Sequence, residues 1–168
     1  MQGLDFSIVS EYWPLIGKGL WWTVVISTAS AVLSVVAGIG FALLVLYATP
    51  MLRYPVRLFM WLFMGTPLLL QLFLIYFGLV QVGIDIPAIW SGIIALSLHF
   101  AVYNADIFRA GIASLDKGQT EAARSLGFGT WRTRIYIVVP QAVRNTVPAV
   151  GNMMIALLKE SSIVSMIG

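Results

Sequence analysis

The chain has 168 residues, of which 60% are hydrophobic and 10% are charged, whereas a soluble domain carries about 25% charged residues. A soluble fold of this length must face water and could not hide so much apolar surface, so the composition predicts an integral membrane protein. Its long uncharged runs are interpreted below as spanning helices, which makes the predicted fold an all-α integral membrane protein. The absence of cysteine excludes disulfides and thiolate metal sites, and the single histidine, His99, excludes a multi-histidine metal cluster.

The first predicted membrane helix covers residues 20–46, inside a long stretch without charge. About 20 apolar residues span a bilayer, so one helix and its flanks fit here. Two tryptophans stand at its start and Tyr47 at its end, as expected of aromatic belts at the membrane surfaces. Residues 1–18 are predicted to form an extracytoplasmic or interfacial segment, with a short helix over residues 6–16 on the lipid surface.

The second predicted helix covers residues 57–80 and contains the sequence Gly65-Thr66-Pro67. Proline removes a backbone donor and glycine loosens a helix, so Gly65 and Pro67 predict a kink. In lipid such a break persists only where neighbouring protein or water pairs the freed backbone groups. The kink therefore either serves packing or lines a transport path.

The third predicted helix covers residues 88–110, with Trp90 near its start. Asp106 and Arg109 are three residues apart near its end, which puts both side chains on one face. We therefore expect them to form an ion pair at the edge of the membrane.

The fourth predicted helix covers residues 139–167, although its uncharged stretch is short and Lys159 and Glu160 follow it. The segment spans a bilayer only if these two residues lie within the membrane zone. Ionisable groups there are costly and are usually functional.

The basic residues indicate the orientation of the chain. Most of them lie between apolar runs, which is a topology signal rather than a nucleic-acid footprint, and no nucleic-acid partner is expected. They follow the first predicted helix or lie at and beyond the end of the third, and they are Arg53, Arg57, Arg109, Lys117, Arg124, Arg132, Arg134 and Arg144. The positive-inside rule then places the N-terminus outside and the loop of residues 111–138 in the cytoplasm.

This loop is predicted to hold a short rigid helix. Asp116 fits the N-cap with Gln119 at the N3 position, close to a capping box, and Gly127 stands where a glycine ends a helix. A second helix is expected near Trp131. Ala122 and Ala123 leave room for close approach to a groove of a partner, although the loop could also cap only its own bundle.

Several segments resemble a known family. Glu121-Ala122-Ala123, Gly127, Ile137 and Pro140, with Val139 where the family prefers leucine, resemble the EAA signature of binding-protein-dependent ABC importer permeases. Residues 65–73, 103–112, 140–144 and 159–162 resemble motifs of the polar-amino-acid subfamily. The resemblance covers nearly the whole chain from about residue 19, and it implies a type I ABC importer transmembrane domain over residues 19–168.

The resemblance implies a permease subunit of an ATP-driven amino acid importer in the bacterial inner membrane. Such permeases pair with a second copy or a paralogue, surrounded by membrane lipid. They receive a polar amino acid from an extracytoplasmic solute-binding protein, and they couple to a cytoplasmic ABC ATPase here through Glu121, Ala122, Ala123 and Gly127. ATP and Mg²⁺ belong to that ATPase, so we expect no enzyme activity and no cofactor in this chain. Family members usually continue into one more membrane helix, so we expect the last transmembrane helix to be missing.

A zwitterionic amino acid needs polar partners at mid-membrane depth. The candidates are Gln71, Asn104, Asp106, Asn152, Lys159 and Glu160. For each, the alternative is hydrogen bonding between helices, an ion pair, or the dimer interface, and His99 is expected to be hydrogen-bonded within the bundle. The rival functions are an ion-gradient-driven secondary transporter or channel subunit, a membrane-embedded enzyme, and a regulatory subunit that binds an ATPase without transporting.

Overall fold

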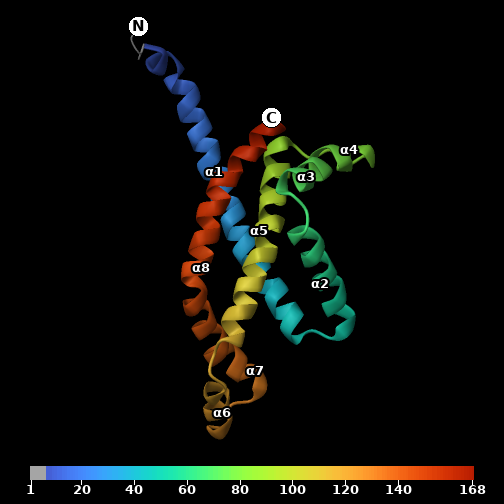
Figure 1. Ribbon diagram of the computed structural model, residues 1–168, viewed down its shortest axis with the longest axis vertical. Coiled ribbons are helices and arrows are strands. Elements are labelled where there is room, and N and C mark those ends of the chain that lie inside the picture. Colours follow the sequence, from blue (N-terminus) through green and yellow to red (C-terminus); the bar gives the residue numbers. More distant parts are fainter. Residues whose placement is uncertain (1–6) are drawn as a thin grey trace.

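The computed structural model describes residues 7–168, and the side chains from residue 12 onward. All regular structure in this part of the chain is helical. Figure 1 shows α1, α5 and α8 along the long axis, with α2 beside them and α3 and α4 turned to the side near the C-terminus. The short helices α6 and α7 lie at the opposite end of the bundle from both termini.

Helix α1 runs without interruption from Ser7 to Tyr47 and is longer than the predicted residues 20–46. The expected separate helix over residues 6–16 is therefore wrong from Ser7 onward, and Phe6 lies outside the described residues. The 36 residues of α1 from Tyr12 to Tyr47 are apolar enough to span a membrane. At about 1.5 Å per residue they extend about 54 Å, well beyond a hydrocarbon core of about 30 Å. The helix must therefore tilt or project from the membrane at one end.

Helices α1 and α5 (Ala88–Ala113) cross closely because small residues line their contact. Ser30, Ser34 and Gly38 of α1 are buried against α5. A Cβ atom on Gly38 would lie 2.7 Å from the Cβ atom of Asn104, so the contact tolerates no side chain there. Close approach through small residues is the usual way for membrane helices to gain packing energy, since lipid gives them no hydrophobic driving force.

The predicted second helix is two helical segments that meet at a sharp bend. Helix α2 covers Pro50–Met64, and the second segment consists of α3 (Leu68–Phe73), the π-helical turn η1 (Leu74–Gly78) and α4 (Leu79–Gln81). The angle between the two segments is 111°. The kink predicted at Gly65 and Pro67 is correctly placed, but the single helix over residues 57–80 is wrong. Helix α2 also begins earlier than the predicted residue 57, because Pro50 occupies its first turn, where no N–H is needed.

The predicted third helix is confirmed as α5, which ends three residues later than residue 110. The predicted fourth helix is α8 (Val139–Glu160), followed by the 3₁₀ helix η3 (Ser161–Met166). Before it, α7 (Thr130–Thr133) and the π-helical turn η2 (Arg134–Val138) continue directly into α8. The connection over residues 111–138 is therefore mostly helical.

Candidate coupling helix and membrane path

The short helix predicted in the loop of residues 111–138 is α6 (Lys117–Ser125), and Asp116 fixes its start. The Asp116 Oδ1 atom accepts a hydrogen bond from the Gly118 N–H at 2.7 Å, as an N-cap residue does. The Gln119 side chain forms a hydrogen bond with another helix and not the expected capping box. Its Oε1 atom accepts a hydrogen bond of 3.3 Å from Gln141 Nε2, which ties α6 to α8.

The end of α6 is fixed by Gly127, which has a φ of +81°. The Gly127 N–H donates to the Arg124 carbonyl at 2.9 Å, and the Phe128 N–H donates to the Ala123 carbonyl at 3.0 Å. This pair of bonds is the Schellman motif, which pairs carbonyls that a helix end would otherwise leave free. Both ends of α6 are thus closed, and the predicted helix with a terminal glycine is confirmed.

The Glu-Ala-Ala triplet is divided between two faces of α6. Ala123 is only 1% exposed and is buried against the chain itself. Glu121 and Ala122 are exposed, as is Arg124 one residue later. The expectation that both alanines leave room for a partner is therefore wrong for Ala123, whose small size lets α6 approach its own bundle.

Further contacts join α6 to the membrane helices. Helix α6 packs against α7 and η2. Thr133 of α7 is buried, and its Oγ1 atom donates to the Gly129 carbonyl at 3.2 Å. The Arg134 guanidinium lies 4.0 Å from the centre of the Tyr47 ring at the end of α1. These contacts place α6, α7, η2 and the end of α1 in one packed unit.

Among the candidate path residues, Gln71 closes the break after α2. Pro67 has no N–H to pair with the Phe63 carbonyl, and Gln71 Nε2 donates to that carbonyl instead at 2.8 Å. The same Nε2 atom lies 2.7 Å from Thr66 Oγ1, and Thr66 Oγ1 donates to the Leu62 carbonyl at 2.9 Å. Thr66 and Gln71 therefore pair the last carbonyls of α2.

The other end of the Gln71 amide contacts α5. His99 Nδ1 lies 3.0 Å from Gln71 Oε1. Because an amide oxygen can only accept, Nδ1 carries the proton and donates. Gln71 is 5% exposed, so this is a buried hydrogen bond between helices, and the expectation that His99 is hydrogen-bonded within the bundle is confirmed. The sequence did not indicate that His99 and Gln71 are partners.

Asn104 and Asp106 each have a partner within the chain. Asn104 is 0% exposed, and its Nδ2 atom donates to Ser34 Oγ at 3.2 Å, across the α1–α5 contact. Asp106 forms the predicted ion pair with Arg109 at 2.7 Å. Ser34 did not stand out in the sequence; its signal is the spacing of serines along the face of α1 that contacts α5.

Asn152, Lys159 and Glu160 lie on α8. Asn152 and Lys159 are exposed and Glu160 is half-buried. None of their side chains has a hydrogen bond or ion pair with another described residue. The structure thus gives Gln71, Asn104 and Asp106 three separate sets of partners and leaves the α8 residues available to other molecules.

Comparison with known proteins identifies the family. Residues 14–168 match the family described as "Binding-protein-dependent transport system inner membrane component". The chain belongs to this family.

Two relatives and one solved structure resemble this inner membrane component closely. The arginine transport system permease protein ArtQ of Bacillus subtilis is 40% identical over 168 residues, which cover 99% of this chain and 77% of ArtQ. "Probable amino-acid ABC transporter permease protein YckA" of the same organism is 38% identical, over 94% of this chain and 70% of its own length. A crystal structure of an amino acid ABC transporter with histidines matches with a TM-score of 0.90 and 41% identity, over 99% of this chain and 78% of that chain.

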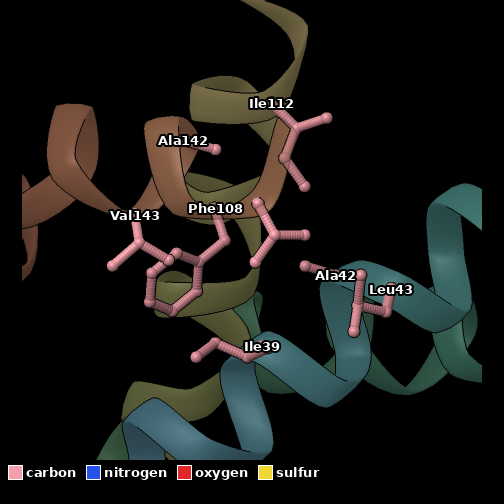
Figure 2. A pocket seen from close by; sticks show the side chains of 8 residues that line it. Ile39, Ala42, Leu43, Phe108, Ile112, Ala142 and Val143 are labelled. Atoms are coloured by element: carbon pink, nitrogen blue, oxygen red, sulfur yellow. The ribbon is translucent and has the colours of Figure 1, made fainter. Parts of the chain in front are cut away.

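The inner membrane component has a small apolar hollow where α1, α5 and α8 meet. Its volume is about 20 Å³, and Figure 2 shows Ile39, Phe108 and Val143 pointing into it among other carbon-only side chains. A zwitterion there would lose its hydration without gaining a polar partner, which excludes this hollow as an amino acid site. Among the side chains described, those of residues 12–168, no group of three or more His, Asp or Glu residues is placed to hold a metal ion.

Proposed function

We propose that this inner membrane component is the permease of an ATP-driven importer for a polar amino acid. The observation that carries the proposal is α6, a helix capped at both ends that lies beyond the ends of α1 and α5. A helix held this firmly passes on a displacement instead of absorbing it. Membership of a binding-protein-dependent transport family supports this function over an ion-gradient-driven transporter or channel.

Coupling to a cytoplasmic ABC ATPase is assigned to the exposed face of α6. Glu121, Ala122 and Arg124 are exposed there. A small residue flanked by charged side chains suits a groove that receives the helix as one body. Gly127 keeps the helix end in a conformation that other residues adopt only with strain. ATP and Mg²⁺ are assigned to the ATPase.

The orientation follows from the charges around α6. Lys117, Arg124, Arg132 and Arg134 lie on or next to it, so the positive-inside rule places this end in the cytoplasm. An outside N-terminus is proposed because α6 and the N-terminal end of α1 lie at opposite ends of the bundle (Figure 1).

The translocation path is assigned to the polar face of α8. Asn152 and Lys159 are exposed on this helix, and a polar or charged side chain is costly against hydrocarbon. That face therefore suits a water-filled path shared with a second permease subunit, either a copy or a paralogue. Lys159 and Glu160 offer opposite charges for the carboxylate and ammonium groups of an amino acid.

A polar amino acid is proposed as the substrate because the proteins that resemble the chain carry such names. ArtQ is named for arginine, and YckA and the solved transporter are named for amino acids. An extracytoplasmic solute-binding protein is proposed to deliver the substrate, in keeping with the family description.

The test is made in vesicles that contain the chain, its ATPase and the binding protein. Glu121→Lys and Gly127→Pro are expected to abolish substrate-stimulated ATP hydrolysis while leaving insertion into the membrane intact. Proline cannot adopt the φ of +81° at residue 127. Gly129→Ala is the control, because Gly129 has a φ of −65° and open space around its Cβ position. Normal coupling in both variants, or uptake driven by an ion gradient without ATP, would refute the proposal.

A further inference from the structure

A second cavity, much larger than the apolar hollow, lies behind α6. Its volume is about 300 Å³, at the lower end of the range of about 300–1,000 Å³ typical of small-molecule sites. Residues from α1, α5, α6, α7 and η2 line it. It lies away from the polar face of α8, and it shares one residue, Arg124, with the exposed face of α6 that is assigned to the ATPase.

The cavity is lined by three basic side chains, Lys117, Arg124 and Arg134, and by one acidic residue, Asp116. Asp116 caps α6 with one carboxylate oxygen. The single ion pair found among described side chains is between Asp106 and Arg109, so none of the three cations has a carboxylate within 4.0 Å. Three cations around one space repel one another, and a bound anion would relieve that repulsion.

Arg134 is held in a fixed position at the wall of this cavity. Its guanidinium lies over the Tyr47 ring at 4.0 Å. This cation–π contact occupies none of the N–H donors in a hydrogen bond. Those N–H groups form the fork that matches the oxygens of a phosphate.

The depth of the cavity indicates the kind of anion. Two candidate membrane spans, Tyr12–Tyr47 and Ala88–Ala113, both end beside it, and lipid headgroups are expected near the ends of membrane spans. Ile112 and Val138 give it an apolar wall, and Ile112 also lines the hollow of Figure 2. A ligand that is anionic at one end and apolar at the other fits this change in polarity.

We propose that this cavity binds a phosphate-bearing anion, namely the headgroup of an anionic phospholipid from the leaflet on the α6 side. Arg134, Lys117 and Arg124 pair with the phosphate, and the acyl chains lie along the apolar wall. The bound lipid would steady α6 against the ends of α1 and α5. The lipid is not the transported substrate, and the site lies apart from the proposed translocation path on α8.

The test is native mass spectrometry of the full chain in neutral detergent, titrated with phosphatidylglycerol or with phosphatidylcholine of the same acyl chains. Phosphatidylglycerol is expected to bind at least about tenfold more tightly, since a lost charge-assisted contact changes affinity by about that factor. Arg134→Gln and the double variant Lys117→Gln/Arg124→Gln are expected to remove most of this preference. Arg132→Gln is the matched control, because Arg132 is exposed on α7 and does not line the cavity.

A competition with inorganic phosphate distinguishes a site for lipid headgroups from a site for free phosphate, since both anions carry the same phosphate group. Displacement of the lipid by phosphate at millimolar concentration would show a phosphate site that is open to soluble anions, whereas persistence of the lipid supports the headgroup assignment. Circular dichroism confirms that each variant keeps its helices. Equal binding of the two lipids would overturn the proposal, and so would a loss in Arg132→Gln as large as that in Arg134→Gln. None of these outcomes depends on transport activity.

Discussion

Replacing Gln71 by leucine would remove the side chain that closes the break between α2 and α3. The substitution keeps a similar volume but leaves two buried groups without partners, the Phe63 carbonyl and the Nδ1 atom of His99. The Thr66 hydroxyl is a poor replacement for the amide, because its one proton is given to the Leu62 carbonyl at 2.9 Å and its Oγ1 atom lies 3.5 Å from the Phe63 carbonyl. An unpaired buried group costs about 1–3 kcal/mol, whereas hydrogen bonds between membrane helices average about 0.6 kcal/mol. We therefore expect a loss of about 2–3 kcal/mol in the free energy of unfolding.

The assay is unfolding of the purified chain in mixed micelles with increasing denaturing detergent, followed by circular dichroism. Gln81→Leu is the control, because Gln81 is exposed at the end of α4 and should change the free energy by less than about 0.5 kcal/mol. His99→Phe completes a double-mutant cycle with Gln71→Leu, with an expected coupling of about 1 kcal/mol. Native stability in Gln71→Leu, or additive effects in the cycle, would show that the contact does not hold the break.

Three further predictions concern packing and charge. Gly38→Ala should destabilise the chain by about 1–3 kcal/mol because its Cβ would collide with α5. Gly40→Ala should be neutral or stabilise by up to about 1 kcal/mol, since its Cβ position is open and alanine favours a helix; equal effects of the two would contradict the close contact. Gly92→Ala should place a Cβ 2.6 Å from Val164 Cγ1, and adding Val164→Ala should restore most of the lost stability in the same unfolding assay. Asp106→Asn should cost less than about 1 kcal/mol, because both partners of its ion pair are nearly half exposed; a larger loss in low-salt unfolding would point to another partner.

The position of the break in the second helix could be predicted from the sequence, but its angle could not. Pro67 lacks an N–H wherever it stands, so local chemistry indicates that the helix is interrupted. The bend of 111° also involves α5, because His99 of that helix donates a hydrogen bond to Gln71, which is 28 residues away in the sequence. No periodicity within residues 57–80 carries information about that partner.

Helix α6 was predictable because its signals are local. Asp116 and Gly127 act within a few residues of their own positions, and the structure places both as expected. The continuity of α7 with α8 was not predictable. The sequence predicted a helix that begins at residue 139, whereas the π-helical turn Arg134–Val138 joins α7 to α8 directly.

The packing of α8 on α5 determines how a displacement of α6 would spread. Glycines of α5 contact α8 and η3 near both ends, Gly111 against Thr146 and Gly92 against Val164. A sliding motion would have to break both contacts, so α5 and α8 are expected to move as one body when the proposed ATPase moves α6. The segment after the break is joined to that body by a hydrogen bond from α5 to Gln71. The strength of this single bond then decides whether α3 follows α5 or stays with α2, which gives the Gln71→Leu variant a consequence for transport as well as for stability.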